Sequence, residues 1–243
     1  MKKKYRKQWE TLGEEDPYWA VLTEPDKKGG NWDTAEFLQT GADEIESLLV
    51  KLDQLGLQPE FGRALDYGCG VGRLSRALAD SFEKVIGVDI SATMLSEARS
   101  INADYDNLQF SQNDGETLTN VSDNSIDFIY SNLVLQHSPR QTQRQLIDEF
   151  CRVLRPGGVL VFQTASEQDK KTIGGLLHYF SGNLFTKLMT RIRYGKNYIM
   201  EMHTIDKKEV VETLQKREIK VVQTEECDAA GSAFISCTYY AVK

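Results

Sequence analysis

The hydrophobic positions of this chain follow helical spacing in some segments and form short apolar runs in others. From Gly41 to Leu55, apolar residues recur every three or four positions with acids between them, which predicts an amphipathic helix. Short runs predict five strands, at residues 63–66, 85–88, 108–110, 126–130 and 159–162. Because helical segments separate these strands, the pattern predicts a mostly parallel sheet with helices on both faces.

The two ends of the chain depart from this alternation. After a predicted helix at Asp206–Lys216, residues 219–224 and 234–242 form two strands joined by a glycine-containing turn. We therefore expect an α/β domain over 41–243 whose sheet is closed by an antiparallel hairpin. Residues 1–40 are expected to form an N-terminal helical cap or lid, and residues 165–205 a helical insertion on the substrate side.

Composition, net charge and cysteine spacing argue against several classes of protein. The 243 residues suffice for one α/β domain, and 40% hydrophobic and 27% charged residues are typical of soluble globular proteins. A net charge of −7 argues against a nucleic-acid substrate. No window is long enough to span a membrane. The four cysteines show no metal-ligand spacing, so we expect reduced thiols, no metal site and a cytoplasmic protein.

The first segment with chemical content is Asp66-Tyr67-Gly68-Cys69-Gly70-Val71-Gly72, between a predicted strand and a predicted helix. Glycines at such a turn let the backbone bend sharply and approach a ligand closely. A dinucleotide-binding G-x-G-x-x-G turn requires a third glycine where this chain has Arg73. The spacing therefore disfavours a nicotinamide cofactor.

Two further polar positions follow the next strands. Asp89, at the end of the second strand, can accept hydrogen bonds from both hydroxyls of a ribose, or it can cap the following helix. Together with the glycine turn, the ribose role is favoured. Asn113-Asp114-Gly115 after the third strand can accept from an adenine amino group or form an Asx turn.

These motifs, with Asp123–Asp127 and Arg152–Gly158, resemble in order and spacing the class I S-adenosylmethionine-dependent methyltransferases of the type 11 branch. That branch includes the ubiquinone and menaquinone-biosynthesis methyltransferases, and the resemblance covers about residues 42–163. It implies a Rossmann-like seven-stranded sheet and S-adenosyl-L-methionine as cofactor, with S-adenosyl-L-homocysteine as product. It also implies a set of cofactor-binding residues: Asp66, Gly68, Gly70, Asp89, Ile90, Asn113, Asp114, Gly115, Ser131 and Asn132.

Methyl transfer depends mostly on alignment, and a base is needed only where the acceptor must lose a proton. His137, just after the fourth strand, is the candidate base, although a loop histidine can equally shape the pocket. On the substrate side, the aromatic-rich N-terminus suggests Tyr18 and Trp19, as ligand contacts or as aromatics that only dock on the body. Arg191, Arg193 and Lys196 form either a solvated face or a site for a carboxylate or phosphate, and His203 is a further substrate candidate.

The sequence thus predicts an enzyme that transfers a methyl group by in-line displacement to oxygen, nitrogen or carbon of a small molecule. The alternatives are a catalytically silent methyltransferase-like scaffold that binds the cofactor and, less favoured, an NAD(P)-dependent oxidoreductase. The apolar segment near residue 180 leaves a homodimer contact open. The acceptor molecule and atom are not specified by these patterns.

Overall fold

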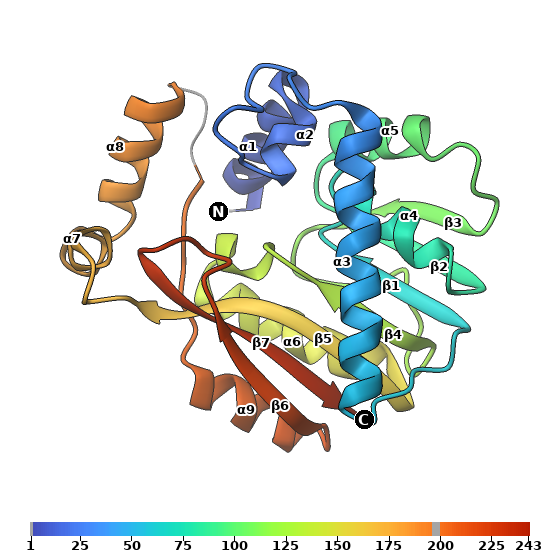
Figure 1. The fold of residues 1–243 in the computed structure, drawn as a ribbon. Coiled ribbons are helices and arrows are strands. Elements are labelled where there is room, and N and C mark those ends of the chain that lie inside the picture. The colour runs from blue at the N-terminus through green and yellow to red at the C-terminus, as the bar shows by residue number, and fades with distance from the viewer. Residues whose placement is uncertain (1, 196–199) are drawn as a thin grey trace. The chain divides into compact units, whose positions relative to one another are not determined.

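One mixed sheet organises the protein (Figure 1). The computed structural model describes residues 2–195 and 200–243, except the side chains of residues 2–4, 185, 193 and 194. In this part of the chain, seven strands follow the order β3-β2-β1-β4-β5-β7-β6. The predicted fold class, a Rossmann-like seven-stranded sheet closed by an antiparallel hairpin, is confirmed.

The strands follow the chain in numerical order. They are β1 (Arg63–Tyr67), β2 (Lys84–Asp89), β3 (Leu108–Gln112), β4 (Ile126–Ser131), β5 (Leu154–Gln168), β6 (Lys220–Cys227) and β7 (Phe234–Val242). The helices are α1 (Lys2–Glu15), α2 (Pro17–Val21), α3 (Thr34–Gln54), α4 (Arg73–Ala79), α5 (Ala92–Ile101), α6 (Arg140–Val153), α7 (Ile173–Ser181), α8 (Asn183–Tyr194) and α9 (Lys207–Lys216). A short 3-10 turn occupies Leu135–His137.

The register of the strands explains why the candidate site residues of the first unit lie at one edge of the sheet. β1 pairs parallel with β2, and β2 pairs parallel with β3, so that Asp89 lies opposite Gln112. The carboxyl ends of these parallel strands therefore lie together, and the loops that follow them share one edge of the sheet. In α/β sheets of this type, ligands bind at that edge.

Strand β5 is longer than the apolar run predicts. The apolar run predicts a strand at 159–162, whereas β5 begins at Leu154 and continues to Gln168. Beyond residue 162 the reason is its antiparallel partner β7, which pairs with β5 from Val159 through Gln168. Pairing with a long neighbouring strand extends β5 well beyond its most apolar residues.

Helix α3 begins earlier than the apolar stripe from Gly41 predicts. Asp33 caps its first turn by accepting from the amide of Glu36, so the helix runs through residue 40, our expected domain boundary. Gly41 lies inside the helix because α4 packs against it. A Cβ at Gly41 would come within 2.6 Å of the carbonyl oxygen of Arg73, so glycine here permits close helix packing.

The chain divides into two compact units. The first contains residues 1–115 and 125–129, and the second contains residues 116–124 and 130–243. In the first, Phe82 stacks on Phe128 with ring centroids 5.3 Å apart. In the second, Phe162 stacks on Tyr239 at 4.9 Å. Each unit therefore has its own aromatic core.

Candidate cofactor site

The glycine turn has the backbone conformation that its sequence predicts. Gly68, Gly70 and Gly72 have φ values of +76°, +53° and +83°, a region that other L-residues rarely adopt. The amides of Gly68 and Cys69 both donate to the carbonyl oxygen of Val88, at 2.7 and 3.1 Å. These bonds fix the loop against the end of β2.

Asp66 lies beneath this loop and is buried. The hydroxyl of Ser75, on α4, donates to its Oδ2 at 2.6 Å. Burial raises the pKa of Asp66 from 3.8 to about 7, since a charged carboxylate loses hydration there. Asp66 therefore ties β1 to α4 and supports the turn from below.

Asp89 connects the glycine turn to α5. Its Oδ2 accepts from the amide of Gly70 at 3.0 Å, and its Oδ1 accepts from the amide of Ser91 at 2.8 Å. The α5 cap itself is Ser91, whose hydroxyl accepts from Met94 at 3.2 Å. Two carboxylate oxygens offer about four lone-pair positions, which leaves room for hydroxyl donors, and the predicted ribose role stays a prediction. Burial raises the pKa of Asp89 above its ordinary value.

The segment after β3 forms an Asx turn, one of the two interpretations that its sequence allows. Asn113 Oδ1 accepts from the amide of Gly115 at 3.1 Å. Gly115 has φ +80°, and a Cβ there would come within 2.7 Å of Cδ1 of Ile90. Ile90 and Gly115 therefore lie side by side next to Asp89, and their predicted contact with adenine stays a prediction. The predicted contact between Asp114 and the adenine amino group stays a prediction.

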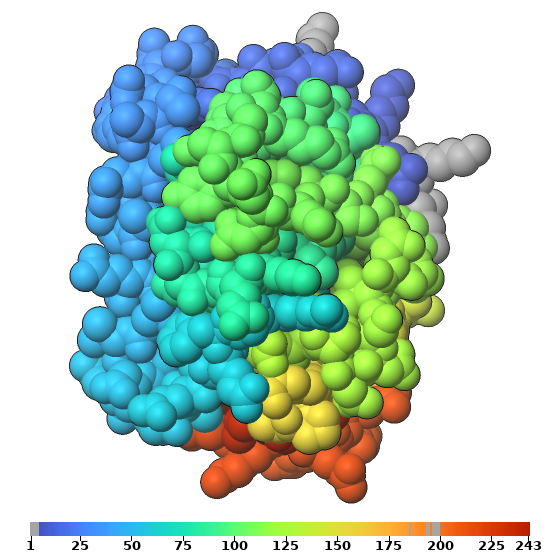
Figure 2. All heavy atoms as spheres, turned by 90° about the vertical axis from the view of Figure 1, so that its right-hand side faces the viewer, coloured from blue at the N-terminus to red at the C-terminus, as the bar shows by residue number. Residues whose placement is uncertain are grey.

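Helix α1 covers the ends of β2 and β3 in the same unit. Glu10 accepts four hydrogen bonds, from the amides of Ala92 and Thr93 and the hydroxyls of Ser91 and Thr93, at 2.7–3.0 Å. Although burial opposes it, these bonds lower the pKa of Glu10 below its ordinary value. Arg6 also donates to the carbonyl oxygen of Asn113 at 3.1 Å. Figure 2 shows the dark blue N-terminal segment beside the green surface of this unit.

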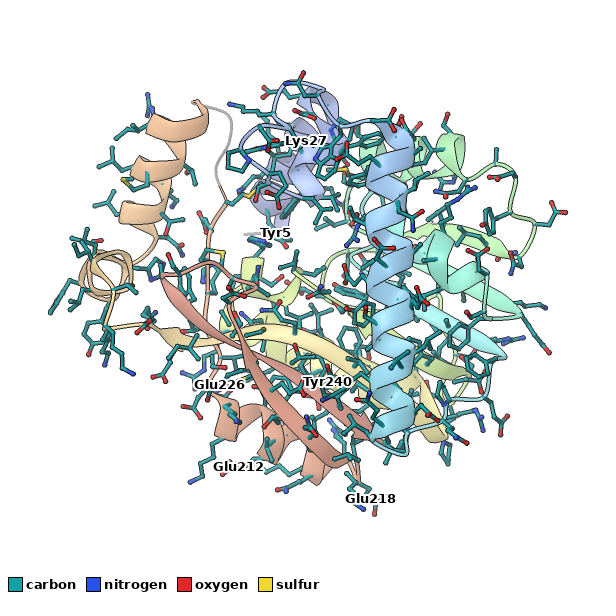
Figure 3. The ribbon with its side chains drawn as sticks, in the orientation of Figure 1. Tyr5, Lys27, Glu212, Glu218, Glu226 and Tyr240 are labelled. Carbon is teal, nitrogen blue, oxygen red and sulfur yellow. The ribbon has the colours of Figure 1, made fainter. Side chains whose placement is uncertain are left out.

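No local signal in the sequence predicts these α1 contacts, because a single acid or arginine in a charged helix is ordinary. The same holds for Val21 at the end of α2, where a Cβ on Gly70 would come within 2.7 Å of Val21 Cγ2. The N-terminal segment thus reaches the glycine turn itself. Figure 3 labels two residues of this segment, Tyr5 on α1 and Lys27 after α2.

Tyr18 and Trp19, predicted as substrate contacts, are both held within the first unit. The Trp19 side chain is fully buried, and its Nε1 donates to the carbonyl oxygen of Glu24 at 2.8 Å. Tyr18 stacks on Phe37 with centroids 4.6 Å apart and donates to Glu97 at 3.2 Å. These contacts support the docking interpretation of the N-terminal aromatics, and their contact with substrate stays a prediction.

The remaining predicted site residues belong to the second unit. Ser131 ends β4 and is buried, and Asn132 follows it. The next residue, Leu133, has φ +62°, and its amide donates to Gln163 Oε1 at 3.2 Å. This left-handed residue turns the chain sharply after Asn132. The predicted roles of Ser131 and Asn132 at the methionine portion remain predictions.

His137 is buried and tied to the segment that precedes α9. Its Nδ1 lies 3.1 Å from the carbonyl oxygen of Glu201, and His203 donates its amide to the carbonyl of Gln136 at 2.7 Å. A carbonyl can only accept, so Nδ1 carries the proton and Nε2 the lone pair. Burial lowers the pKa of His137 from 6.5 to about 4. His137 is therefore a neutral and weak base.

The other predicted substrate residues differ in exposure. His203 is half-buried, and its Nε2 lies 3.6 Å from the Glu201 carboxylate. Arg191 is exposed on α8. The Arg193 side chain and the Lys196 position lie outside the described residues. No described contact brings His203 and Arg191 together.

We predict that His137 makes stability depend on pH. The unfolded chain binds a proton near pH 6.5 and the folded chain only near pH 4, so stability is lost as pH falls between these values. Relative to His137→Gln, the wild type should lose about 2 kcal/mol of unfolding free energy between pH 7 and pH 5. Urea unfolding at the two pH values measures this difference. An equal loss in both proteins would contradict it.

Comparisons with known proteins agree with this geometry. Residues 65–162 match the family described as "Methyltransferase domain". Residues 65–162 thus carry a methyltransferase domain, and the sheet has the fold of the class I enzymes. S-adenosylmethionine is the methyl donor of this class, and the sequence prediction of family and cofactor is confirmed.

Individual relatives show how far the likeness extends. Malonyl-[acyl-carrier protein] O-methyltransferase of Methylococcus capsulatus is 39% identical over 124 residues, which are 50% of this chain and 43% of that protein. Trans-aconitate 2-methyltransferase of Deinococcus radiodurans is 36% identical over 121 residues, 48% of this chain and 44% of that protein. The matches therefore span less than half the length of these curated relatives.

Among solved structures, magnesium protoporphyrin IX methyltransferase from Synechocystis PCC 6803 with bound SAH covers both chains fully. Its TM-score is 0.66 at 21% identity. This likeness shows the fold. Among the described residues, no cluster of three or more potential metal ligands occurs, and no described helix is long and apolar enough to cross a membrane.

Proposed function

We propose that this methyltransferase domain makes the protein an enzyme that methylates a carboxylate of a small molecule. The site fits the cofactor because Asp89 holds Gly70 and Ser91 while keeping lone pairs for a ribose. Ile90 and Gly115 offer an apolar wall beside it. S-adenosylmethionine supplies an electrophilic methyl group on its sulfonium.

The observation that favours a carboxylate acceptor is the low basicity of the histidines. Burial lowers the pKa of His137, His178 and His203, which are all the histidines of the chain. An alcohol or a protonated amine must lose a proton to react, and weak bases help little. A carboxylate is already ionised near neutral pH, so it needs no base. The relatives above are named for malonyl-[acyl-carrier protein] and trans-aconitate, and both of these molecules carry carboxylates.

In this proposal the chain's own residues act by positioning. The glycine turn and Asp89 orient the ribose, and α1 and α2 act as a lid that excludes water from the cofactor edge of the first unit. The acceptor oxygen forms a bond to the methyl carbon as the sulfur–carbon bond breaks, which gives a methyl ester and S-adenosylhomocysteine. His137 then serves to hold residues 201–203 rather than to remove a proton. We place the protein in the cytoplasm, in keeping with its four free thiols.

The test uses S-adenosylmethionine labelled in its methyl group and two acceptor panels, of di- and tricarboxylates and of primary amines such as phosphoethanolamine. We expect label in a product of the carboxylate panel that releases methanol on mild base treatment, as an ester does. Label only in a base-stable product would contradict the carboxylate assignment. Cofactor binding with no labelling in either panel would favour the non-catalytic scaffold instead.

A further inference from the structure

Helices α7 and α8 of the second unit carry an exposed apolar stripe where a surface helix would ordinarily be polar. In α7 the exposed residues Ile173, Leu176, Leu177 and Phe180 recur at positions i, i+3, i+4 and i+7. In α8 they are Leu184, Leu188 and Ile192, at i, i+4 and i+8. Each spacing places the residues on one helix face. Phe180 is 80% exposed and Leu184 72% exposed.

The opposite face of α7 is fixed to the body of the unit. His178 is buried, with its ring edge against Phe234 at 4.8 Å between centroids. Gly175 lies so close to Asp169 that a Cβ would come within 2.0 Å of the Asp169 carbonyl oxygen. Asn183, at the start of α8, accepts from the amide of Met202 at 2.8 Å. The apolar stripe therefore faces outward because its other face is anchored.

The sequence of residues 170–200 carries charges of only one sign, although Lys187 pairs with Glu201 at 2.9 Å. Between Asp169 and Glu201 the sequence contains no acidic residue, although the whole chain has 36. The same stretch contains six basic residues, Lys170, Lys171, Lys187, Arg191, Arg193 and Lys196. Lys170 lies over the Tyr179 ring at 4.1 Å, which keeps its charge beside the apolar face. Figure 3 shows side chains of α7 and α8 projecting into open space, while the labelled acids Glu212 and Glu218 lie by α9 and β6.

We propose that α7 and α8 form a docking surface, residues 170–192, for an anionic lipid bilayer. An apolar helix face flanked by lysine and arginine lies in the headgroup region, with its apolar side chains toward the acyl chains. The basic residues select a negatively charged surface, and the net charge of −7 opposes binding of the rest of the chain. Because neither helix is long enough to span a bilayer, the protein binds at the surface. The proposal does not depend on the identity of the acceptor.

The direct test is flotation of the full chain with vesicles of phosphatidylglycerol and phosphatidylcholine in equal amounts, at low salt. We expect binding to these vesicles, and at least tenfold weaker binding to phosphatidylcholine alone. The double variant Phe180→Glu, Leu184→Glu should lose binding by more than tenfold. Lys171→Glu should weaken it about fivefold or more, since each basic residue near the surface contributes about that factor.

Matched variants elsewhere serve as controls. Phe61→Glu replaces another exposed aromatic, and Lys208→Glu another exposed lysine, both outside the docking surface. Each should leave vesicle binding unchanged, and circular dichroism checks that all variants fold. Equal flotation of the α7–α8 variants and the controls would overturn the proposal, as would no binding to anionic vesicles. Sedimentation showing a dimer that the double variant abolishes would also overturn it, and would make this surface an interface between copies.

Discussion

Asp89→Ala should weaken the binding of S-adenosylhomocysteine by more than about tenfold, because hydrogen bonds to a charged group contribute roughly 1.5–3 kcal/mol. The variant loses the acceptor proposed for the ribose hydroxyls. It also releases the amides of Gly70 and Ser91, so the glycine turn is less well ordered before binding. Both effects act in the same direction. Isothermal titration calorimetry measures the affinity, and thermal unfolding checks that the variant is folded.

Two comparisons separate the role of Asp89 from a general charge effect. Asp106→Ala removes an exposed acid near the end of α5 in the same unit and should leave the affinity unchanged. Asp89→Asn retains one oxygen acceptor and should give an affinity between those of wild type and Asp89→Ala. Wild-type affinity in folded Asp89→Ala would remove Asp89 from the ribose role.

Glu10→Ala should detach α1 from the start of α5 and lower cofactor affinity about tenfold. The Glu10 carboxylate accepts from backbone amides at the helix N-terminus, where a negative charge is also stabilised by the helix dipole. Each such hydrogen bond to a charged group contributes roughly 1.5–3 kcal/mol. Without them, α1 keeps the Arg6 bond to Asn113 and the packing of Leu12 and Gly13, and the lid opens more often.

The opening of α1 has a second readout. Trypsin should cleave after Arg6 or Lys7 faster in Glu10→Ala than in wild type, because local unfolding exposes the backbone. Glu14→Ala removes an exposed acid of the same helix and is the matched control, with wild-type affinity and cleavage. If Glu10→Ala and Glu14→Ala behave alike, α1 is not a lid held by Glu10.

The site residues that could be predicted from sequence are those that a local backbone conformation requires. Gly68, Gly70 and Gly115 stand where φ is positive, and Asp89 ends the strand β2. Such positions leave a signature within a few residues. The hairpin of β6 and β7 was predictable for the same reason, since each strand has its own apolar pattern.

Contacts between distant segments left no such signature. Glu10 reaches Thr93, and Arg6 reaches Asn113, across more than 80 residues of sequence. Nothing in the charge pattern of α1 distinguishes these side chains from solvated ones. The low pKa of His137 likewise arises from burial, and the residues next to His137 in the sequence do not show that it is buried. Strand β5 continues beyond residue 162, where its apolar run ends, because β7, which is distant in the sequence, pairs with it.

Titration calorimetry of the wild-type chain with S-adenosylhomocysteine shows whether the glycine turn and Asp89 bind an adenosyl cofactor. NADH is the control ligand, since the Arg73 position distinguishes this turn from a dinucleotide-binding one. We expect micromolar-range binding of S-adenosylhomocysteine and none of NADH. Binding of NADH but not of S-adenosylhomocysteine would mean that the glycine turn and Asp89 bind a dinucleotide instead.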